Sequence, residues 1–209
     1  MSEPLIHPDI AKAHTLPSRF YTDENTFRNL ISGMQNCWYF GAHSSQFAEY
    51  NVIPLTDIET MLSEALMLTN SDRLRCLSNV CTHRGMLVAT EPCNSNTLQC
   101  RYHGRTFGID GCFKNMPEFQ DVEDFPSPSD DLANFPVTDW KRLQLVGGDL
   151  YLEEAITELE SRLGWIDVES FQHDPSRYRS YEIKANWALY VDNYLEGFHI
   201  PFVHGDLHD

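Results

Sequence analysis

The chain has 209 residues, of which 42% are hydrophobic and 12% aromatic, so it can bury a core as one large domain or as one domain and part of another. Its formal net charge of −16 excludes binding to nucleic acid or to an anionic membrane surface through non-specific electrostatics. The charge fits a highly soluble protein or an acidic docking face for a basic partner. Residues 1–20 contain no apolar signal segment and no apolar run could span a membrane, so we expect no membrane contact and a cytoplasmic location.

The first 36 residues are predicted to form an N-terminal arm and one helix. Residues 1–20 mix charges with prolines and look irregular. Thr22 is placed to cap a helix whose first turn holds Asp23 and Glu24, which suit the positive end of the helix dipole. Apolar residues then follow helical spacing up to Met34.

Residues 37–155 alternate between short apolar runs and turn residues, which predicts a small antiparallel β-domain. The predicted strands are 38–40, 50–55, 65–69, 74–80, 97–101, 106–109, 112–114, 135–137, 143–146 and 150–152. Turns are expected at 70–72 and 147–149, and Asp110-Gly111 is a strong hairpin signal. Residues 121–131, rich in Asp, Pro and Ser, are predicted to be a surface loop.

Residues 156–209 change in composition and predict helices. Apolar residues at 156, 159 and 163 predict a helix that Gly164 ends, and residues 178–183 suggest a strand. The clearest helical period runs over 187–199 and places Asp192, Glu196 and His199 on its polar face. Pro201 is expected to break this helix before His204.

Six cysteines, at 37, 76, 81, 93, 100 and 112, show no disulfide framework, so we expect free, buried thiols in a reducing compartment. The motif Cys81-Thr-His83 is separated by sixteen residues from Cys100-Arg-Tyr-His103. Each arm supplies one thiolate and one imidazole, whereas structural zinc fingers usually pair Cys with Cys and His with His. A [2Fe–2S] cluster with two Cys on one iron and two His on the other needs this mixed arrangement, and an atypical zinc site is the alternative.

These two arms resemble the Rieske motif, including the residues after each arm, Arg84-Gly85 and Gly104. The resemblance implies that Cys81 and Cys100 hold one iron and that His83 and His103 hold the other. Neutral histidine ligands raise the potential of such clusters into a range of about −150 to +300 mV, so the domain would relay electrons. Backbone N–H groups near the two glycines would donate hydrogen bonds to sulfur.

The stretch from Asn193 to His204 is, alone, also compatible with an amphipathic helix that carries two incidental histidines. It resembles the mononuclear-iron motif of Rieske oxygenase catalytic subunits, in which an acidic residue precedes two histidines at this spacing. The resemblance makes His199 and His204 ligands of a mononuclear Fe(II), within a set of two histidines and one carboxylate. Glu196 would be the catalytic acid that bridges the iron ligand to a Rieske histidine of a neighbouring subunit, with Asp192 as a rival for that role.

Glutamate at position 196 resembles the branch of the family that oxidises quaternary amines such as carnitine. The third ligand, a carboxylate, is expected far downstream, because Asp206 and Asp209 follow His204 too closely. We therefore expect a truncated product, or a second chain that completes the catalytic domain.

The resemblance covers nearly the whole chain and implies an α+β protein: an arm and helix (1–36), an antiparallel Rieske domain (37–155) and the start of a helix-plus-sheet catalytic domain (156–209). Its implied activity is mono- or dioxygenation, by ring hydroxylation or demethylation of a small organic substrate with O₂. Electrons would come from NAD(P)H through a reductase or ferredoxin, and the full-length subunit would form a homotrimer or an α₃β₃ assembly. A Rieske electron carrier without its own chemistry and a zinc-stabilised binding module are the alternatives.

Overall fold

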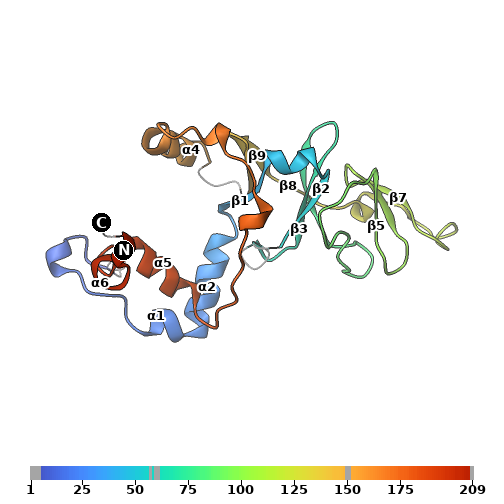
Figure 1. The fold of residues 1–209 in the computed structure, drawn as a ribbon. Coiled ribbons are helices and arrows are strands. Elements are labelled where there is room, and N and C mark those ends of the chain that lie inside the picture. The colour runs from blue at the N-terminus through green and yellow to red at the C-terminus, as the bar shows by residue number, and fades with distance from the viewer. Residues whose placement is uncertain (1–5, 57, 59–61, 149–151, 208–209) are drawn as a thin grey trace. The chain divides into compact units, whose positions relative to one another are not determined.

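A computed structural model describes residues 6–56, 58, 62–148 and 152–207 (Figure 1). The chain divides into two compact units. The β unit comprises residues 33–177, and the helical unit comprises residues 1–32 and 178–209. Three antiparallel sheets and several helices confirm the predicted α+β class.

The β unit contains three antiparallel sheets. The first has the order β1–β10–β9, with bounds Trp38–His43, Leu143–Gly147 and Val137–Trp140. The second has the order β2–β3–β4–β8, with bounds Val52–Leu55, Leu66–Asn70, Leu74–Ser78 and Asn134–Phe135. The third has the order β5–β6–β7, with bounds Thr97–Gln99, Thr106–Gly108 and Phe113–Asn115.

The core lies on both faces of the four-stranded sheet. Because side chains alternate along a strand, Met67 of β3 packs into one buried cluster while Leu66 and Leu68 pack into another. The first cluster also contains Cys81 and Cys100, so the two predicted thiol ligands are anchored in the hydrophobic core. The elements that carry them are positioned by burial of apolar surface, which is the main favourable term in folding.

Most predicted strands are present, and the differences have local causes. The predicted strand 135–137 is divided at Pro136 into β8, which pairs with β4, and β9, which pairs with β10. Proline has no N–H to donate to a ladder, so it separates the two pairings. The predicted strand 150–152 is wrong at Leu152, which begins α4 (Leu152–Leu163), and its other two residues lie outside the described residues. As predicted, α4 ends before Gly164, whose N–H donates to the carbonyl of Glu160 at 3.0 Å.

The helical unit contains α1 (Arg19–Thr22), α2 (Glu24–Met34, whose last two residues belong to the β unit), α5 (Trp187–Leu195) and α6 (Ile200–Val203). The predicted cap Thr22 is wrong, because Thr22 ends α1. The carboxylate of Asp23 accepts the N–H of Thr26 at 2.8 Å and so satisfies the start of α2. The hydroxyl of Tyr21 donates to Asp192 at 2.8 Å, which ties α1 to α5.

Residues 178–183 do not form the predicted strand. A strand needs a neighbouring ladder, and the described elements of the helical unit are all helical. Short 3₁₀ helices complete the described elements: Ile10–Lys12, Ser44–Ala48, Pro128–Asp130, Val168–Ser170, Pro175–Arg177 and Gly205–Leu207.

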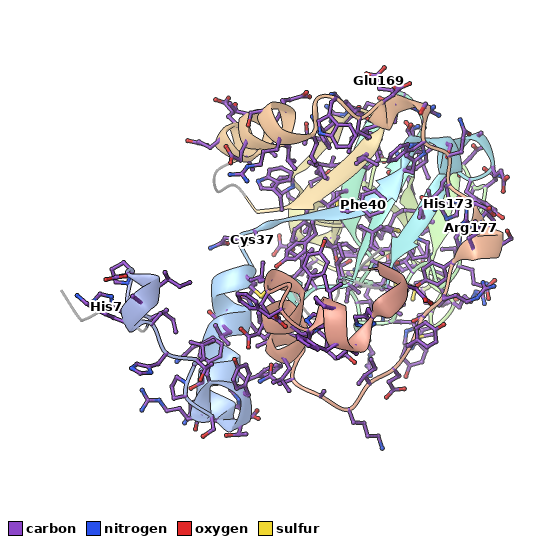
Figure 2. All side chains as sticks on the ribbon, turned by 60° about the vertical axis from the view of Figure 1, so that its left-hand side comes forward. His7, Cys37, Phe40, Glu169, His173 and Arg177 are labelled. Atoms are coloured by element: carbon purple, nitrogen blue, oxygen red, sulfur yellow. The ribbon has the colours of Figure 1, made fainter. Side chains whose placement is uncertain are left out.

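All six cysteines are free, as predicted, but the expectation that they are buried is only partly right. Cys76 is buried in the core, whereas Cys37 and Cys112 are exposed. Figure 2 shows Cys37 immediately before β1. Among the described residues, no helix combines the length and apolarity needed to cross a bilayer.

Candidate metal centres

The first ligand arm follows β4 and is a turn closed by the main chain. The N–H of Cys81 donates to the carbonyl of Met86 at 2.9 Å, and the N–H of Gly85 donates back to the carbonyl of Cys81 at 3.0 Å. Gly85 has φ +71°, a conformation that favours glycine because it lacks a Cβ. The turn fixes His83 between the thiol and the glycine.

The second arm lies between β5 and β6 and repeats the same hydrogen bonds. The N–H of Cys100 donates to the carbonyl of Arg105 at 2.8 Å, and the N–H of Gly104 donates to the carbonyl of Cys100 at 3.0 Å. Gly104 has φ +73°. Two turns with the same main-chain hydrogen bonds therefore present one thiol and one imidazole each.

The two arms bring their side chains together. The rings of His83 and His103 lie 4.7 Å apart between centroids, and the two cysteine side chains are hydrogen-bond neighbours that are each at least 97% buried. Burial raises the pKa of the Cys81 thiol, and burial followed by the charge of His103 lowers the pKa of His83. The environment thus favours a neutral His83 imidazole, the form that ligates metals.

The sequence predicts that backbone N–H groups near the two glycines donate to sulfur. The N–H groups of Gly85 and Gly104 themselves close the turns on carbonyl oxygens. The backbone N–H of His83 instead hydrogen-bonds the thiol of Cys81 and opposes the rise in its pKa. This donor comes from the ligand turn itself.

Three residues that the sequence analysis missed surround the arms. Arg105, only 3% exposed, donates to the hydroxyl of Thr82 at 2.6 Å and to the carboxylate of Asp130 at 2.7 Å. Asp130 lies in the predicted surface loop 121–131, yet its side chain is largely buried in this ion pair. The sequence signal was a charged residue directly after the second arm, followed by a strand that enters the core.

The second constellation departs from the predicted helix 187–199. Helix α5 ends at Leu195, and Glu196 is extended, with φ −108° and ψ 147°. The carboxylate of Glu196 accepts the N–H of Phe198 at 2.5 Å, which satisfies that backbone group outside a helix. Asp192 therefore does not share one helical face with Glu196 and His199. Pro201 was also predicted to break the helix, but it lies in the first turn of α6, where proline is tolerated.

Glu196, His199 and His204 nevertheless lie close together. Oε1 of Glu196 is 2.5 Å from Nδ1 of His199, and the rings of His199 and His204 are 5.3 Å apart between centroids. The hydrogen bond from His199 is the main cause that lowers the pKa of Glu196. Asp206 follows on the next turn, and Asp209 lies outside the described residues.

Within the described part of the chain, no group of three or more His, Cys, Asp or Glu side chains is arranged around a single metal ion. A Rieske cluster does not require one, because its four ligands divide two and two between its irons.

Comparison with known proteins decides between the classes that the sequence left open. Residues 37–126 match the family model of the Rieske [2Fe-2S] domain, and residues 171–209 match the model of the ring-hydroxylating alpha subunit catalytic domain. The chain belongs to the Rieske oxygenase family. Each match contains one of the two constellations, and an electron carrier would contain only the first.

Individual relatives agree with this assignment. This chain is 30% identical over 211 residues to the carnitine monooxygenase oxygenase subunit of Escherichia coli K12, covering 95% of this chain and 54% of that protein. It is 27% identical to the chloroplastic choline monooxygenase of Spinacia oleracea, covering 97% of this chain and 47% of that protein. The chain therefore spans about half the length of these relatives.

A solved structure shows the same fold. The quaternary ammonium Rieske monooxygenase in complex with L-carnitine superposes with a TM-score of 0.78 at 24% identity. The superposition covers 99% of this chain and 58% of that chain.

These matches assign a Rieske [2Fe–2S] cluster and a mononuclear iron to the family's two domains. The residues of the first arm fit the cluster. Nδ1 of His83 is buried and has no hydrogen-bond partner, which is costly for a polar atom unless it serves as a ligand. Together with two buried thiols of soft-ligand character, this donor set suits a [2Fe–2S] cluster.

Proposed function

We propose that this chain is the electron-receiving and iron-binding part of a Rieske non-haem iron oxygenase. The observation that carries the proposal is that one chain contains both the paired Cys/His arms and the Glu196, His199 and His204 set. When bound, the [2Fe–2S] cluster supplies electrons one at a time and Fe(II) supplies reductive activation of O₂, used to hydroxylate or demethylate a small organic molecule. The electrons come from NAD(P)H through a separate reductase or ferredoxin.

Each candidate site residue has its own proposed role. Cys81 and Cys100 hold one cluster iron, and His83 and His103 hold the other. His199 and His204 hold Fe(II). Glu196 hydrogen-bonds Nδ1 of His199, which leaves Nε2 as the ligand atom and fixes the ring for it. The same carboxylate is the proposed bridge to a Rieske histidine of a neighbouring subunit.

We propose a quaternary ammonium compound as the substrate. Two kinds of relatives support this class, since their names specify carnitine and choline. The glutamate at position 196 also resembles the branch that oxidises quaternary amines. Two monooxygenations are possible on such a cation. One removes a carbon substituent from the nitrogen, and the other hydroxylates a carbon beside the nitrogen.

The remaining proposals concern organisation. The Rieske domain spans residues 37–155, after an arm of residues 1–36, and residues 156–209 belong to the catalytic domain. The order of the two family matches supports this arrangement. The full-length subunit assembles as a homotrimer or α₃β₃ complex in the cytoplasm.

The first test is iron, zinc and acid-labile sulfide per chain, measured on anaerobically purified protein. We expect two irons and two sulfides after purification, because four cluster ligands are brought together, whereas Fe(II) held by only two histidines of this chain is lost unless it is added back. Zinc without sulfide would contradict the proposal and favour a zinc-stabilised module. Three irons with two sulfides would show that a third mononuclear ligand lies in this chain.

Glu196 and its rival Asp192 are separable by Fe(II) binding. We expect Glu196→Ala to weaken Fe(II) binding by about 10–100-fold, the usual cost of losing a partner that orients a metal-bound histidine. Asp192→Asn should leave binding unchanged, since Asp192 hydrogen-bonds Tyr21 and not His199. Anaerobic titration with Fe(II), followed by dialysis equilibrium, measures both. Equal losses in the two variants would instead assign Asp192 a part in the site.

A further inference from the structure

Arg105 is a buried cation directly behind the second ligand turn. Its side chain is only 4% exposed, and its own carbonyl accepts the N–H of Cys100. One guanidinium nitrogen donates to Oγ1 of Thr82 at 2.6 Å, and Thr82 lies between Cys81 and His83 in the first turn. A single side chain therefore joins the two turns.

Arg105 also contacts the loop that follows the third sheet. Its second nitrogen donates to Oδ1 of Asp130 at 2.7 Å, and the hydroxyl of Thr82 donates to the carbonyl of Asp130 at 2.9 Å. Asp130 also accepts the N–H of Ser127 at 2.8 Å. The loop that carries Asp130 is thus held against the first turn through the arginine.

Aromatic rings pack against the guanidinium group of Arg105. The guanidinium carbon lies 5.2 Å from the centroid of Phe113 and 5.5 Å from that of Phe125. Phe125 contacts Phe119 at 5.2 Å, and Phe119 contacts the ring of His83 at 5.9 Å. A continuous apolar wall therefore runs from the arginine to a cluster histidine, and charges in such surroundings act more strongly than in water.

A buried ion pair is weak evidence for stability, because well-packed apolar residues often stabilise a fold equally well. Stability alone therefore does not explain why a charged residue, Arg105, lies at this buried position. We propose that Arg105 is a positioning residue that fixes the two ligand turns relative to each other and raises the reduction potential of the cluster they hold. This inference rests on the proposed function, since it requires the cluster.

The direction of the effect on the reduction potential follows from the positive charge of Arg105. Reduction adds one negative charge to the cluster, and a nearby cation stabilises the reduced form more than the oxidised form. The carboxylate of Asp130 opposes this effect, but its side chain is 17% exposed against 4% for Arg105, so solvent screens it more.

The test is a redox titration of the anaerobically purified 209-residue chain, followed by circular dichroism of the cluster. We expect Arg105→Gln to make reduction at least tenfold less favourable, which for one electron is a fall of about 59 mV in midpoint potential. We expect Asp130→Asn to shift the potential in the opposite direction. Arg105→Lys should keep a potential near that of the original protein but lower the thermal stability, because lysine cannot bridge two partners with a planar fork.

Arg75→Gln is the matched control. Arg75 also pairs with an aspartate, Asp72, at 2.6 Å, and the other charges that act on it are Asp110 and Cys112, none of them a proposed cluster ligand. It should leave the potential unchanged.

The outcomes separate the two proposals. A cluster that is present in every variant at an unchanged potential, or shifts of the same sign in Arg105→Gln and Asp130→Asn, would overturn the inference and leave the proposed function standing. Absence of acid-labile sulfide in the original protein would overturn the proposed function itself. If Arg105→Gln does not retain the cluster, the direction of the shift in Asp130→Asn decides.

Discussion

Replacing Cys100 with alanine is expected to remove the [2Fe–2S] cluster completely. Cys100 is 2% exposed and its side chain neighbours that of Cys81 from the opposite turn, so it supplies one of the two proposed thiolate ligands of the same iron. Visible absorbance, iron and acid-labile sulfide should fall together to background. Thermal unfolding of the same samples establishes that the variant is folded.

Cys112→Ala is the matched control for this experiment. Cys112 is a free, exposed cysteine beyond β6, and its thiol neighbours Asp110 and not the ligand arms. It should keep full iron and sulfide. A Cys100→Ala protein that still carries two irons and two sulfides would mean that the ligand set is wrongly assigned.

Phe107→Ala is expected to destabilise the fold by about 3–5 kcal/mol, the usual cost of truncating a buried aromatic side chain. Phe107 lies on β6, is fully buried and packs in the same cluster as Cys81 and Cys100. Since native domains have only about 5–15 kcal/mol of stability in total, this single change removes a large fraction. Urea unfolding monitored by far-UV circular dichroism measures it.

Phe40→Ala serves as the comparison. Phe40 lies on β1 (Figure 2). It is 55% exposed, so its replacement should change the free energy of unfolding by about 0.5 kcal/mol or less. Equal losses for the two phenylalanines would contradict the assignment of the core to the cluster behind the ligand turns.

The closeness of the two Cys/His arms was predictable from the sequence, because ligand chemistry imposes residue types and spacing. Cys81, His83, Cys100 and His103 meet in the structure as the two motifs required. The glycines after each arm are positive-φ positions whose N–H groups close the turns.

The role of Arg105 was not predictable from local pattern. Its partner Asp130 is 25 residues away, in a segment whose Asp, Pro and Ser content indicates a solvent-exposed loop. A charged residue is buried only when a specific partner compensates it, and such a partner is a tertiary contact that periodicity does not reveal.

The end of α5 was missed for a related reason. Apolar spacing extends the helix to His199, but the side chain of Glu196 captures a backbone N–H that a helix would use, and Gly197 weakens helix propensity at the same point. Apolar periodicity indicates which face of a helix is apolar, but it does not indicate where the backbone stops being helical. The consequence is that Glu196 approaches His199 from an extended segment.

The two ligand turns are closed by main-chain hydrogen bonds to the same relative positions, and both are anchored to the buried core by their cysteines. Ordering a loop costs conformational entropy, whether the loop orders during folding or when metal binds. Here that cost falls on the folding of the polypeptide, before any iron arrives. The protein should therefore differ from zinc fingers, which are unfolded without metal, and accept its cluster as a prefolded scaffold from which a chelator removes iron without unfolding the chain.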